Sequence, residues 1–426
     1  MGEKPGDKIR VVCDKEEHVG ILINKKKDVT VVKLENGYNV GIENKKIKKI
    51  EVLEEGKEIE IKYEKKAEKK KGLPNISILH TGGTIASKVD YRTGGVYASF
   101  KAEDFLGMFP EVGDIANISS KQVLNVMSED ILFKDYVKLA EAVKKEIDDG
   151  AKGVIIGHGT DTIAMTSAAL AFIFEKVPIP VLLVGAQRSS DRGSSDAAMN
   201  LVCAAEFIAK TDFAGVALCM HESAADETCV ILPATKTRKM HTSRRDAFKA
   251  IDDKPIARIE YKTRKIKFLK DHVRAGGNVL VKNKFEDKVA IIKTYPNMKP
   301  HLIDALIDNG YKGLVLEATG IGQAPTNIEE NLPNYEALKK FISKGGVIVL
   351  TSQCIFGRVH PDIYTNCRRL KDIGIIFGED MLTETAFVKL AWLLGNYNTD
   401  DTKKMLTENL RGEINPQISE EDYLEE

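Results

Sequence analysis

The sequence predicts an α/β protein, with a two-domain body built on parallel sheets and a small all-β barrel in front of it. At 426 residues the chain is longer than one ordinary domain. Short β-branched runs without helical periodicity fill its first part. A charged run then separates them from a long region in which apolar strands alternate with helical patterns.

Residues 1–65 are predicted to form the barrel, of the SH3-like kind. The runs KIRVVCD, HVGILIN, VTVVKL and YNVGI are short and rich in β-branched residues, and the turn at Glu35–Gly37 is typical of a hairpin. Several short strands with no helix between them favour closure into a barrel. Residues 66–75 form a solvated charge run that ends in Gly-Leu-Pro, and we interpret them as a linker.

Residues 76–270 are predicted to form the first α/β domain, which carries the active site. Strands are expected at ISILH, KGVIIG and IPVLLVG, and helical spacing is found at Lys134–Ile147 and Ala164–Lys176. Nearly continuous apolar strands that alternate with helices predict a parallel sheet covered on both faces. Because ligands bind beyond the carboxyl ends of such strands, we expect the loops TGGT, GHGTDT and GAQRSSDRGSSD to meet at one rim.

Residues 288–426 repeat this alternation and are predicted to form a second α/β domain. The expected strands lie in KVAIIKTYPNM, KGLVLEATGIGQAP and GGVIVLTSQCIFGRV. Residues 261–287 are charged and show no clear period, so we interpret them as the connection between the two domains.

The loops at the expected rim carry the residue types that amide chemistry needs. The glycine pair of TGGT lets a ligand approach the main chain, and threonine hydroxyls can attack or relay protons. Asp161 can hold a substrate ammonium, and a lysine such as Lys239, held among hydroxyl groups away from water, can act as a base. Taken singly, these features also fit a tight turn, a helix N-cap and a surface charge.

Four stretches of the sequence closely resemble the asparaginase/glutaminase family in their order and spacing, over about Leu73 to Gly395. They are LPNISILHTGGTIAS, GHGTDT, LLVGAQR and TRKMHTS. That family hydrolyses amides through a threonine nucleophile. The resemblance implies that Thr84 is the nucleophile and that Thr160, Asp161 and Lys239 form the second catalytic group. The sequence leaves open which threonine attacks first.

Further site residues also follow from this resemblance. Tyr97 in GGVYASF matches the tyrosine of the family's flexible loop, and Tyr91 is the weaker candidate. NVMSEDI is similar to the substrate loop and implies Ser128 and Glu129 as substrate-binding residues. One branch of the family has Gln where this chain has Glu129, so selectivity between asparagine and glutamine does not carry over.

The barrel, charged linker and asparaginase-like body together resemble the glutamine-hydrolysing subunits of archaeal glutamyl-tRNA(Gln) amidotransferases. This resemblance implies that the chain hydrolyses glutamine and supplies ammonia to an E subunit. The partner would use ATP and Mg²⁺ to convert Glu-tRNA(Gln) to Gln-tRNA(Gln), in a heterotetramer containing a homodimer of this chain. The alternatives are a free L-asparaginase/glutaminase with an accessory domain, and a catalytically inactive scaffold or RNA-binding protein.

Several classes are disfavoured by the sequence itself. It contains no apolar run of membrane-spanning length, no P-loop, no GxGxxG fingerprint and no zinc-type cysteine spacing. We therefore expect a cytoplasmic protein with no metal and no cofactor of its own. The six cysteines are scattered, and we expect reduced and mostly buried thiols.

Overall fold

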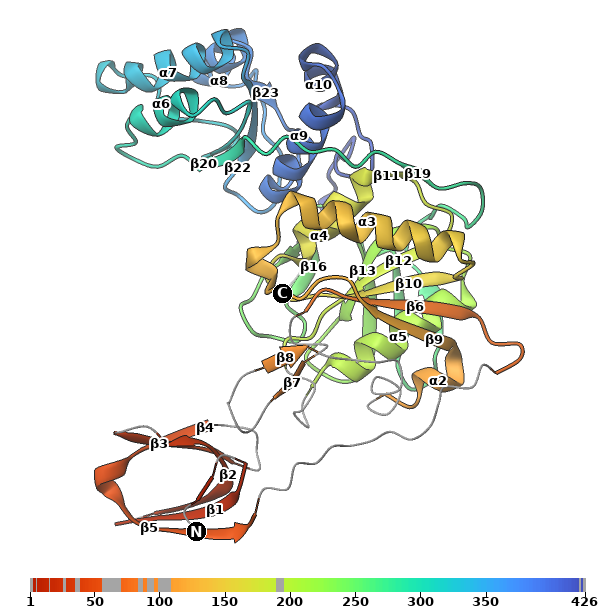
Figure 1. Ribbon diagram of the computed structural model, residues 1–426. Coiled ribbons are helices and arrows are strands. Elements are labelled where there is room, and N and C mark those ends of the chain that lie inside the picture. Colours follow the sequence, from red (N-terminus) through yellow and green to blue (C-terminus); the bar gives the residue numbers. More distant parts are fainter. Residues whose placement is uncertain are drawn as a thin grey trace.

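The computed structural model has the predicted α/β fold, with a small antiparallel sheet at the N-terminus (Figure 1). The structure describes residues 3–4, 6–14, 16–25, 28–34, 39–55, 70–82, 87–89, 96–98, 109–188, 195–420 and 423.

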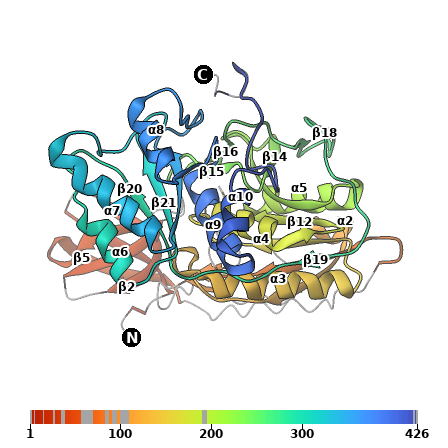
Figure 2. The same cartoon turned by 90° about the horizontal axis from the view of Figure 1, so that it is seen from above.

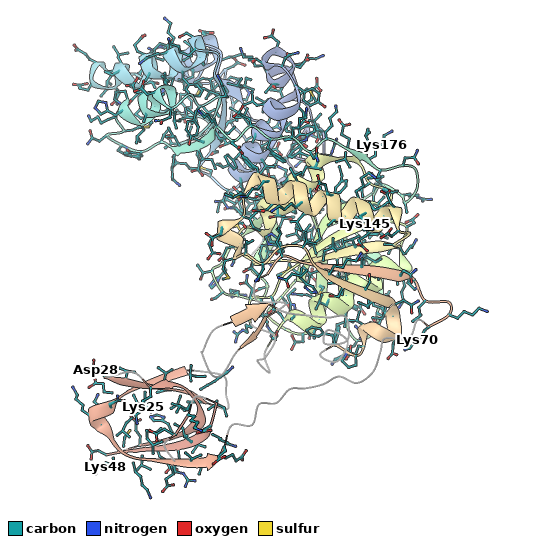
Figure 3. The ribbon with its side chains drawn as sticks, viewed as in Figure 1. Lys25, Asp28, Lys48, Lys70, Lys145 and Lys176 are labelled. Atoms are coloured by element: carbon teal, nitrogen blue, oxygen red, sulfur yellow. The ribbon has the colours of Figure 1, made fainter. Side chains whose placement is uncertain are left out.

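The N-terminal sheet has five antiparallel strands in the order β4-β3-β2-β1-β5 and curls on itself (Figure 1). Alternate residues of β1 and β3 are buried, and these pack with their neighbours into a core of Ile9, Val11, Leu22, Val32 and Ile42. Charged side chains such as Lys48 point away from this core (Figure 3). The strands are β1 (Lys8–Cys13), β2 (Glu17–Lys25), β3 (Val29–Leu34), β4 (Asn39–Glu43) and β5 (Ile47–Glu54), with a 3-10 turn η1 (Asn44–Lys46) before β5.

The main sheet has eight strands in the order β18-β17-β14-β13-β12-β10-β6-β9. The five strands from β13 to β9 are parallel, as predicted, whereas β14, β17 and β18 extend the sheet antiparallel. The central strands β10 and β12 are buried along their whole length, which is why they are continuously apolar. The eight strands are β6 (Asn75–His80), β9 (Asn117–Gln122), β10 (Gly153–Gly157), β12 (Pro180–Val184), β13 (Gly215–His221), β14 (Thr228–Pro233), β17 (Ala257–Glu260) and β18 (Ile266–Phe268).

Helices cover both faces of this sheet (Figure 1). One face packs against α3 and α4, and the opposite face packs against α2 and α5. The apolar side of α3 faces the sheet, while Lys145 on its outer side points away (Figure 3). These helices are α2 (Val112–Ile115), α3 (Phe133–Asp148), α4 (Ile163–Ile173) and α5 (Ala197–Lys210).

Among the described residues three short strand pairs lie outside the main sheet, and one of them, together with β18 of that sheet, changes the local predictions. The helix expected to reach Lys176 ends at Ile173, because the next three residues form β11 and pair with β19. Both β18 and β19 lie within 261–287, which the sequence suggested was only a connection. The pairs are β7 (Ser87–Val89) with β8 (Val96–Ala98), β11 (Phe174–Lys176) with β19 (Leu280–Val281), and β15 (Thr237–Lys239) with β16 (Phe248–Ala250).

The C-terminal region has a parallel four-stranded sheet in the order β20-β21-β22-β23. Its helix α9 packs on α4 of the main body, where Trp392 stacks on Phe172 with ring centroids 5.7 Å apart (Figures 1 and 2). One apolar core therefore continues from the main sheet into the C-terminal sheet. The elements are β20 (Val289–Lys293), α6 (His301–Asp308), β21 (Gly313–Ala318), η4 (Glu329–Asn331), α7 (Leu332–Ser343), β22 (Val347–Ser352), α8 (Thr365–Asp372), β23 (Ile376–Phe377), α9 (Thr383–Asn396) and α10 (Thr399–Met405).

Two general expectations can be compared with the described part of the chain. Cys203, Cys219, Cys229 and Cys367 are buried, as expected for most of the cysteines. No helix among the described residues is long and apolar enough to cross a bilayer.

The separate core of the N-terminal sheet leads to a first prediction. Its buried cluster is made only of residues between Ile9 and Ile50, so removing the sheet exposes no apolar core in the main body. Deletion of residues 1–69 should therefore leave the rest folded, with a Tm within about 4 °C of the intact chain. Thermal unfolding followed by circular dichroism measures this. A truncated chain that aggregates or has no cooperative transition would contradict the prediction.

Candidate active site

The candidate site lies where four neighbouring parallel strands end. β9, β6, β10 and β12 are adjacent in the sheet and run in the same direction, so the loops that follow them meet at one rim. Main-chain hydrogen bonds connect these loops: Thr81 N donates to Gly157 O at 3.1 Å, and Val126 N donates to Thr81 O at 3.0 Å. His158 N donates to Val184 O at 3.0 Å, which joins the loop after β10 to the end of β12. The expected meeting of the three loops is thus confirmed for their described residues.

Glycines allow this close approach. Gly82 has a φ of +105°, and a Cβ atom there would lie 2.6 Å from the carbonyl oxygen of Val126. A Cβ atom on Gly159 would lie 2.9 Å from Cβ of Ser128, and one on Gly185 would lie 2.8 Å from Cγ2 of Thr160. Each of these glycines therefore lets a neighbouring loop pack against bare backbone.

Lys239 reaches the rim from β15, outside the main sheet. Its Nζ donates to Thr160 Oγ1 at 2.9 Å and to Asp161 Oδ1 at 2.7 Å. The Lys239 side chain is 15% exposed and that of Asp161 is 67% exposed, so the lysine is shielded while the carboxylate faces solvent. A hydroxyl, a lysine and an accessible carboxylate thus form one contiguous group.

Thr160 has a second neighbour that sequence reasoning missed. Oγ1 of Thr160 lies 3.5 Å from Oε1 of Gln187, at the outer limit of a hydrogen bond. Among the described residues Nε2 of Gln187 has no hydrogen-bond partner, although it is buried. Asp196 fixes this loop by accepting hydrogen bonds from the backbone nitrogens of Gln187 and Arg188, both at 3.0 Å. The sequence placed the loop GAQRSSDRGSSD at the rim and LLVGAQR among the family-like stretches, but it did not single out Gln187 within them.

His158 supports the loop that carries Thr160 and Asp161. Its Nδ1 lies 2.7 Å from Gly159 O, which can only accept, so Nδ1 carries the hydrogen. Burial lowers the pKa of His158 to about 4, and neutral Nε2 therefore accepts from Thr166 Oγ1 at 2.8 Å. His158 thus has a structural role beneath the site.

Ser128 and Glu129, expected from the substrate loop, lie beside the Thr160 loop on η3 (Ser128–Asp130). Ser128 is buried, and its carbonyl oxygen accepts from Thr162 Oγ1 at 2.6 Å. Glu129 is exposed. The structure thus brings Ser128 against the catalytic loop and leaves Glu129 at the solvent side.

Two predicted site residues cannot be assessed in the same way. Thr84 lies outside the described residues. Tyr97 belongs to β8 and stands opposite Lys88 of β7, and its side chain also lies outside the description. Their proposed roles stay predictions. The part of the chain that the structure describes contains no group of three or more His, Cys, Asp or Glu side chains that could hold a metal ion.

Comparisons of the sequence with known families divide the chain into three matched segments. Residues 75–274 match the family described as "Asparaginase, N-terminal", and residues 288–406 match "Glutaminase/Asparaginase C-terminal domain". Residues 4–53 match "GatD N-terminal domain".

Curated relatives match over nearly the whole length. The chain is 45% identical over 435 residues to the D subunit of the glutamyl-tRNA(Gln) amidotransferase of Pyrococcus furiosus, covering 99% of this chain and 98% of that protein. It is 42% identical over 421 residues to the protein of the same name from Methanococcus maripaludis, covering 97% of this chain and 99% of the relative.

Among solved structures, the thermostable L-asparaginase from Thermococcus kodakarensis superposes with a TM-score of 0.71 at 30% identity. The match covers 80% of this chain and 100% of the asparaginase. L-asparaginase I from Vibrio cholerae superposes with a TM-score of 0.69 at 26% identity, covering 80% of this chain and 99% of that chain.

The buried histidines lead to a second prediction, on stability. Burial lowers the pKa of both His158 and His80 to about 4, whereas an unfolded histidine titrates near 6.5. The unfolded state therefore binds more protons between about pH 6.5 and about pH 4, so the free energy of unfolding falls as the pH falls through that window. Thermal unfolding at a series of pH values measures the decline.

Replacing one of these histidines should make the decline shallower. His158→Gln keeps a donor and an acceptor but removes one titrating group, so its Tm should fall less between about pH 7 and about pH 5. His301→Gln changes an exposed histidine and is the matched control. Equal slopes in the intact chain and His158→Gln would show that His158 does not contribute.

Proposed function

The chain belongs to the family of glutamyl-tRNA(Gln) amidotransferase D subunits, and from this premise we propose that it hydrolyses glutamine and supplies the ammonia to a partner subunit. The observation that carries the proposal is the contact of Lys239 Nζ with Thr160 Oγ1 at 2.9 Å and Asp161 Oδ1 at 2.7 Å. These residues occupy the rim of a body that matches both asparaginase segments. A site that activates a hydroxyl beside a carboxylate is suited to cleaving the amide of a free amino acid.

The proposed reaction proceeds through an acyl-enzyme. The hydroxyl of Thr84 attacks the side-chain amide carbon of glutamine, and Lys239 accepts its proton directly or through Thr160 or Tyr97. Collapse of the tetrahedral intermediate breaks the C–N bond, and a proton returned to the nitrogen lets it leave as ammonia. Water then hydrolyses the threonine ester, which releases glutamate and restores the hydroxyl.

Substrate is proposed to be held by the loops on either side of Thr160. The exposed carboxylate of Asp161 pairs with the α-ammonium, and Ser128 contacts the α-carboxylate end. Glu129 is the second substrate-binding residue proposed on the same loop. Backbone N–H groups beyond the strand ends are the proposed donors for the oxyanion. Gln187 is added to this set because its amide oxygen lies 3.5 Å from Thr160 Oγ1. Its buried amide nitrogen has no partner among the described residues.

The partner proposed for this chain is the amidotransferase E subunit. In this scheme the E subunit binds Glu-tRNA(Gln) and uses ATP and Mg²⁺ to activate the glutamate carboxylate, which the ammonia then attacks. This chain supplies no cofactor, and two copies of it form a homodimer within a heterotetramer in the cytoplasm. Near-full-length similarity to subunits named for that reaction, including the N-terminal segment, supports the assignment.

A second candidate function is free amide hydrolysis. The solved structures that superpose on 80% of the chain are named L-asparaginases. Their similarity does not include the N-terminal segment, whereas that of the amidotransferase subunits does. The two functions differ in whether ammonia release depends on a partner.

The assignment of Lys239 leads to a third prediction. Lys239→Arg keeps the positive charge but cannot give up its proton at accessible pH, so kcat for ammonia release should fall by about a hundredfold or more. Thr160→Ala and Thr84→Ala should be at least as damaging, with the fold intact. Lys249→Arg, on the paired strand β16, is the matched control. Activity restored by Lys239→Arg would leave Lys239 with only an electrostatic role.

The role as an ammonia donor leads to a fourth prediction. We expect the loop that carries Tyr97 to close over the site fully only in the assembled complex. Ammonia release from glutamine should then rise when the E subunit, ATP and Glu-tRNA(Gln) are added. A tenfold rise corresponds to about 1.4 kcal/mol. Steady-state ammonia assays with glutamine and with asparagine, without and with these additions, make the measurement. Equal rates in all mixtures, with asparagine as the better substrate, would favour the free asparaginase.

A further inference from the structure

β15 carries the candidate base on one side and ion pairs to the C-terminal region on the other. Side chains alternate along a strand, so Arg238 points opposite to Thr237 and Lys239. Lys236 lies in the turn immediately before β15. Lys239 reaches Thr160 of the main body. Arg238 instead pairs with Glu384 of α9 at 3.5 Å, and Lys236 pairs with Asp380 at 2.7 Å. Two carboxylates of the C-terminal region, Asp380 and Glu384, thus form ion pairs with residues in and directly before β15.

The Lys236–Asp380 pair is completely buried. Both side chains are 0% exposed, and Lys236 Nζ also donates to the carbonyl oxygen of Asp380 at 2.8 Å. The Asp380 carboxylate accepts in addition from Asn415 N at 3.0 Å, and a nitrogen of Arg358 lies 3.6 Å away. Lys236 O accepts from Ile251 N at 2.8 Å, directly after β16. Both the main chain and the side chain of Lys236 are therefore held.

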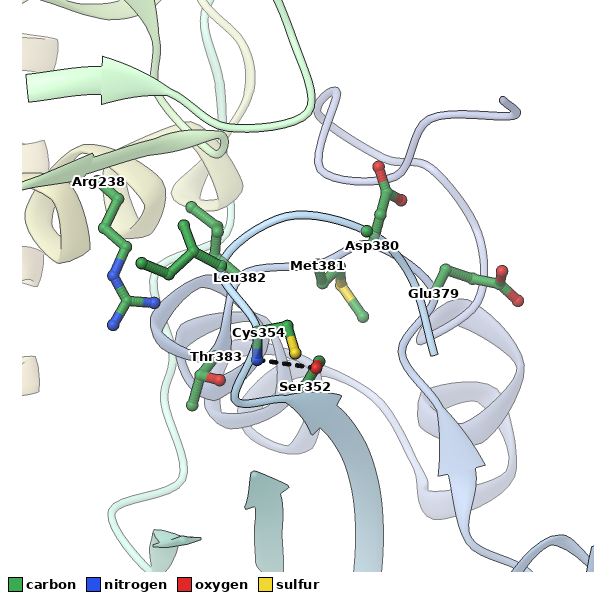
Figure 4. A pocket seen from close by; sticks show the side chains of 10 residues that line it. Arg238, Ser352, Cys354, Glu379, Asp380, Met381, Leu382 and Thr383 are labelled. Carbon is green, nitrogen blue, oxygen red and sulfur yellow. Dashed lines mark hydrogen bonds between the residues drawn. The ribbon is translucent and has the colours of Figure 1, made fainter. Parts of the chain in front are cut away.

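Asp380, the acidic partner of this pair, also lines a recess that does not include the candidate catalytic group. A recess between β15 and the loop before α9 is lined by Arg238, Glu379, Asp380 and Thr383 (Figure 4). Thr160 and Lys239 do not line this recess, although Lys239 follows Arg238 directly. Arg238, which points opposite to Lys239, thus borders the same recess as Asp380, the partner of Lys236.

We infer that Lys236 and Asp380 are positioning residues, which set the register of β15 so that Lys239 meets Thr160. The inference rests on the proposed function, because it takes Lys239 to be the base. β15 is three residues long and pairs with β16 in a two-stranded sheet of its own. A tight turn joins it to the main sheet, and Thr237 Oγ1 donates to the carbonyl oxygen of Pro233, the last residue of β14, at 2.6 Å. The two hydrogen bonds from Lys236 Nζ to the side chain and the main chain of Asp380 fix the position of β15 relative to the C-terminal region.

The chain offers a matched control for a purely structural role. Lys389 and Glu413 form a second ion pair with both side chains 0% exposed, at 2.6 Å. Lys389 Nζ also donates to the carbonyl oxygens of Leu406 and Glu408. Lys389 belongs to α9, its partners lie in the C-terminal segment after α10, and none of these residues is part of β15. Loss of this pair removes the same kind of buried interaction and leaves the contacts of Lys236 in place.

The experiment compares Lys236→Met with Lys389→Met in the full chain, using glutamine and measuring kcat, KM and Tm. Both variants should lower the Tm. Lys236→Met should lower kcat by about tenfold or more while KM changes less than about twofold, because Asp161 and Ser128 lie on other loops. Lys389→Met should keep kcat within about twofold of the intact chain. Lys236→Met should also move the midpoint of the pH profile of kcat, whereas a smaller folded fraction would only scale that profile.

Two further variants separate the possible failures. Lys236→Met/Asp380→Leu removes both charges and is used if Lys236→Met does not fold. A folded Lys236 variant with normal kcat, or an equal fall of kcat in Lys389→Met, would overturn the positioning role. Lys239→Ala is measured in parallel: if it stays active the proposed function fails, and if it is inactive while Lys236→Met is normal, only the present inference fails.

Discussion

The candidate site depends on the placement of one lysine by a short strand that is not part of the main sheet. β15 has three residues and pairs with β16 in a sheet of its own. Thr160 and Asp161 instead follow β10 of the eight-stranded sheet, whose register is set by ladders on both sides. The position of Lys239, 2.9 Å from Thr160, therefore depends on how the C-terminal region packs against the main body. On this inference, residues of the interface between the two regions help to form the site.

This interface combines a non-directional and a directional interaction. The stack of Trp392 on Phe172 and the continuous apolar core bring α9 against α4, but apolar burial alone tolerates small shifts. Buried ion pairs are poor sources of net stability, although breaking one costs about 3–5 kcal/mol. The Lys236–Asp380 pair fixes the relative position of the two segments, because each hydrogen bond has a narrow range of distance and angle. Such a pair is better suited to fixing a register than to stabilising a fold.

The sequence was most informative where structure is local. Apolar runs such as Gly153–Gly157 predicted buried parallel strands, and the rim where their loops meet followed from strand direction. Motif order identified the group around Lys239, which the structure brings together. Predictions failed where partners are far apart in the chain: the helix expected to reach Lys176 ends early because Phe174 pairs with the distant β19. Lys236 lies in a basic stretch and its partner is 144 residues further on, so only the fold reveals the buried pair.

The N-terminal sheet and the asparaginase-like body are separate parts of the chain. Their separation limits which residues can distinguish an ammonia-donating subunit from a free asparaginase. The catalytic rim lies within the 80% of the chain that superposes on L-asparaginases, and its contacts come from that body. The N-terminal sheet has its own core, to which no described residue from the rest of the chain belongs. If ammonia release depends on a partner, as proposed, the partner can act on groups that the rim already contains. If Lys236 and Asp380 set the register of β15, as inferred, a small shift of the C-terminal region would change catalysis without altering any residue that contacts substrate.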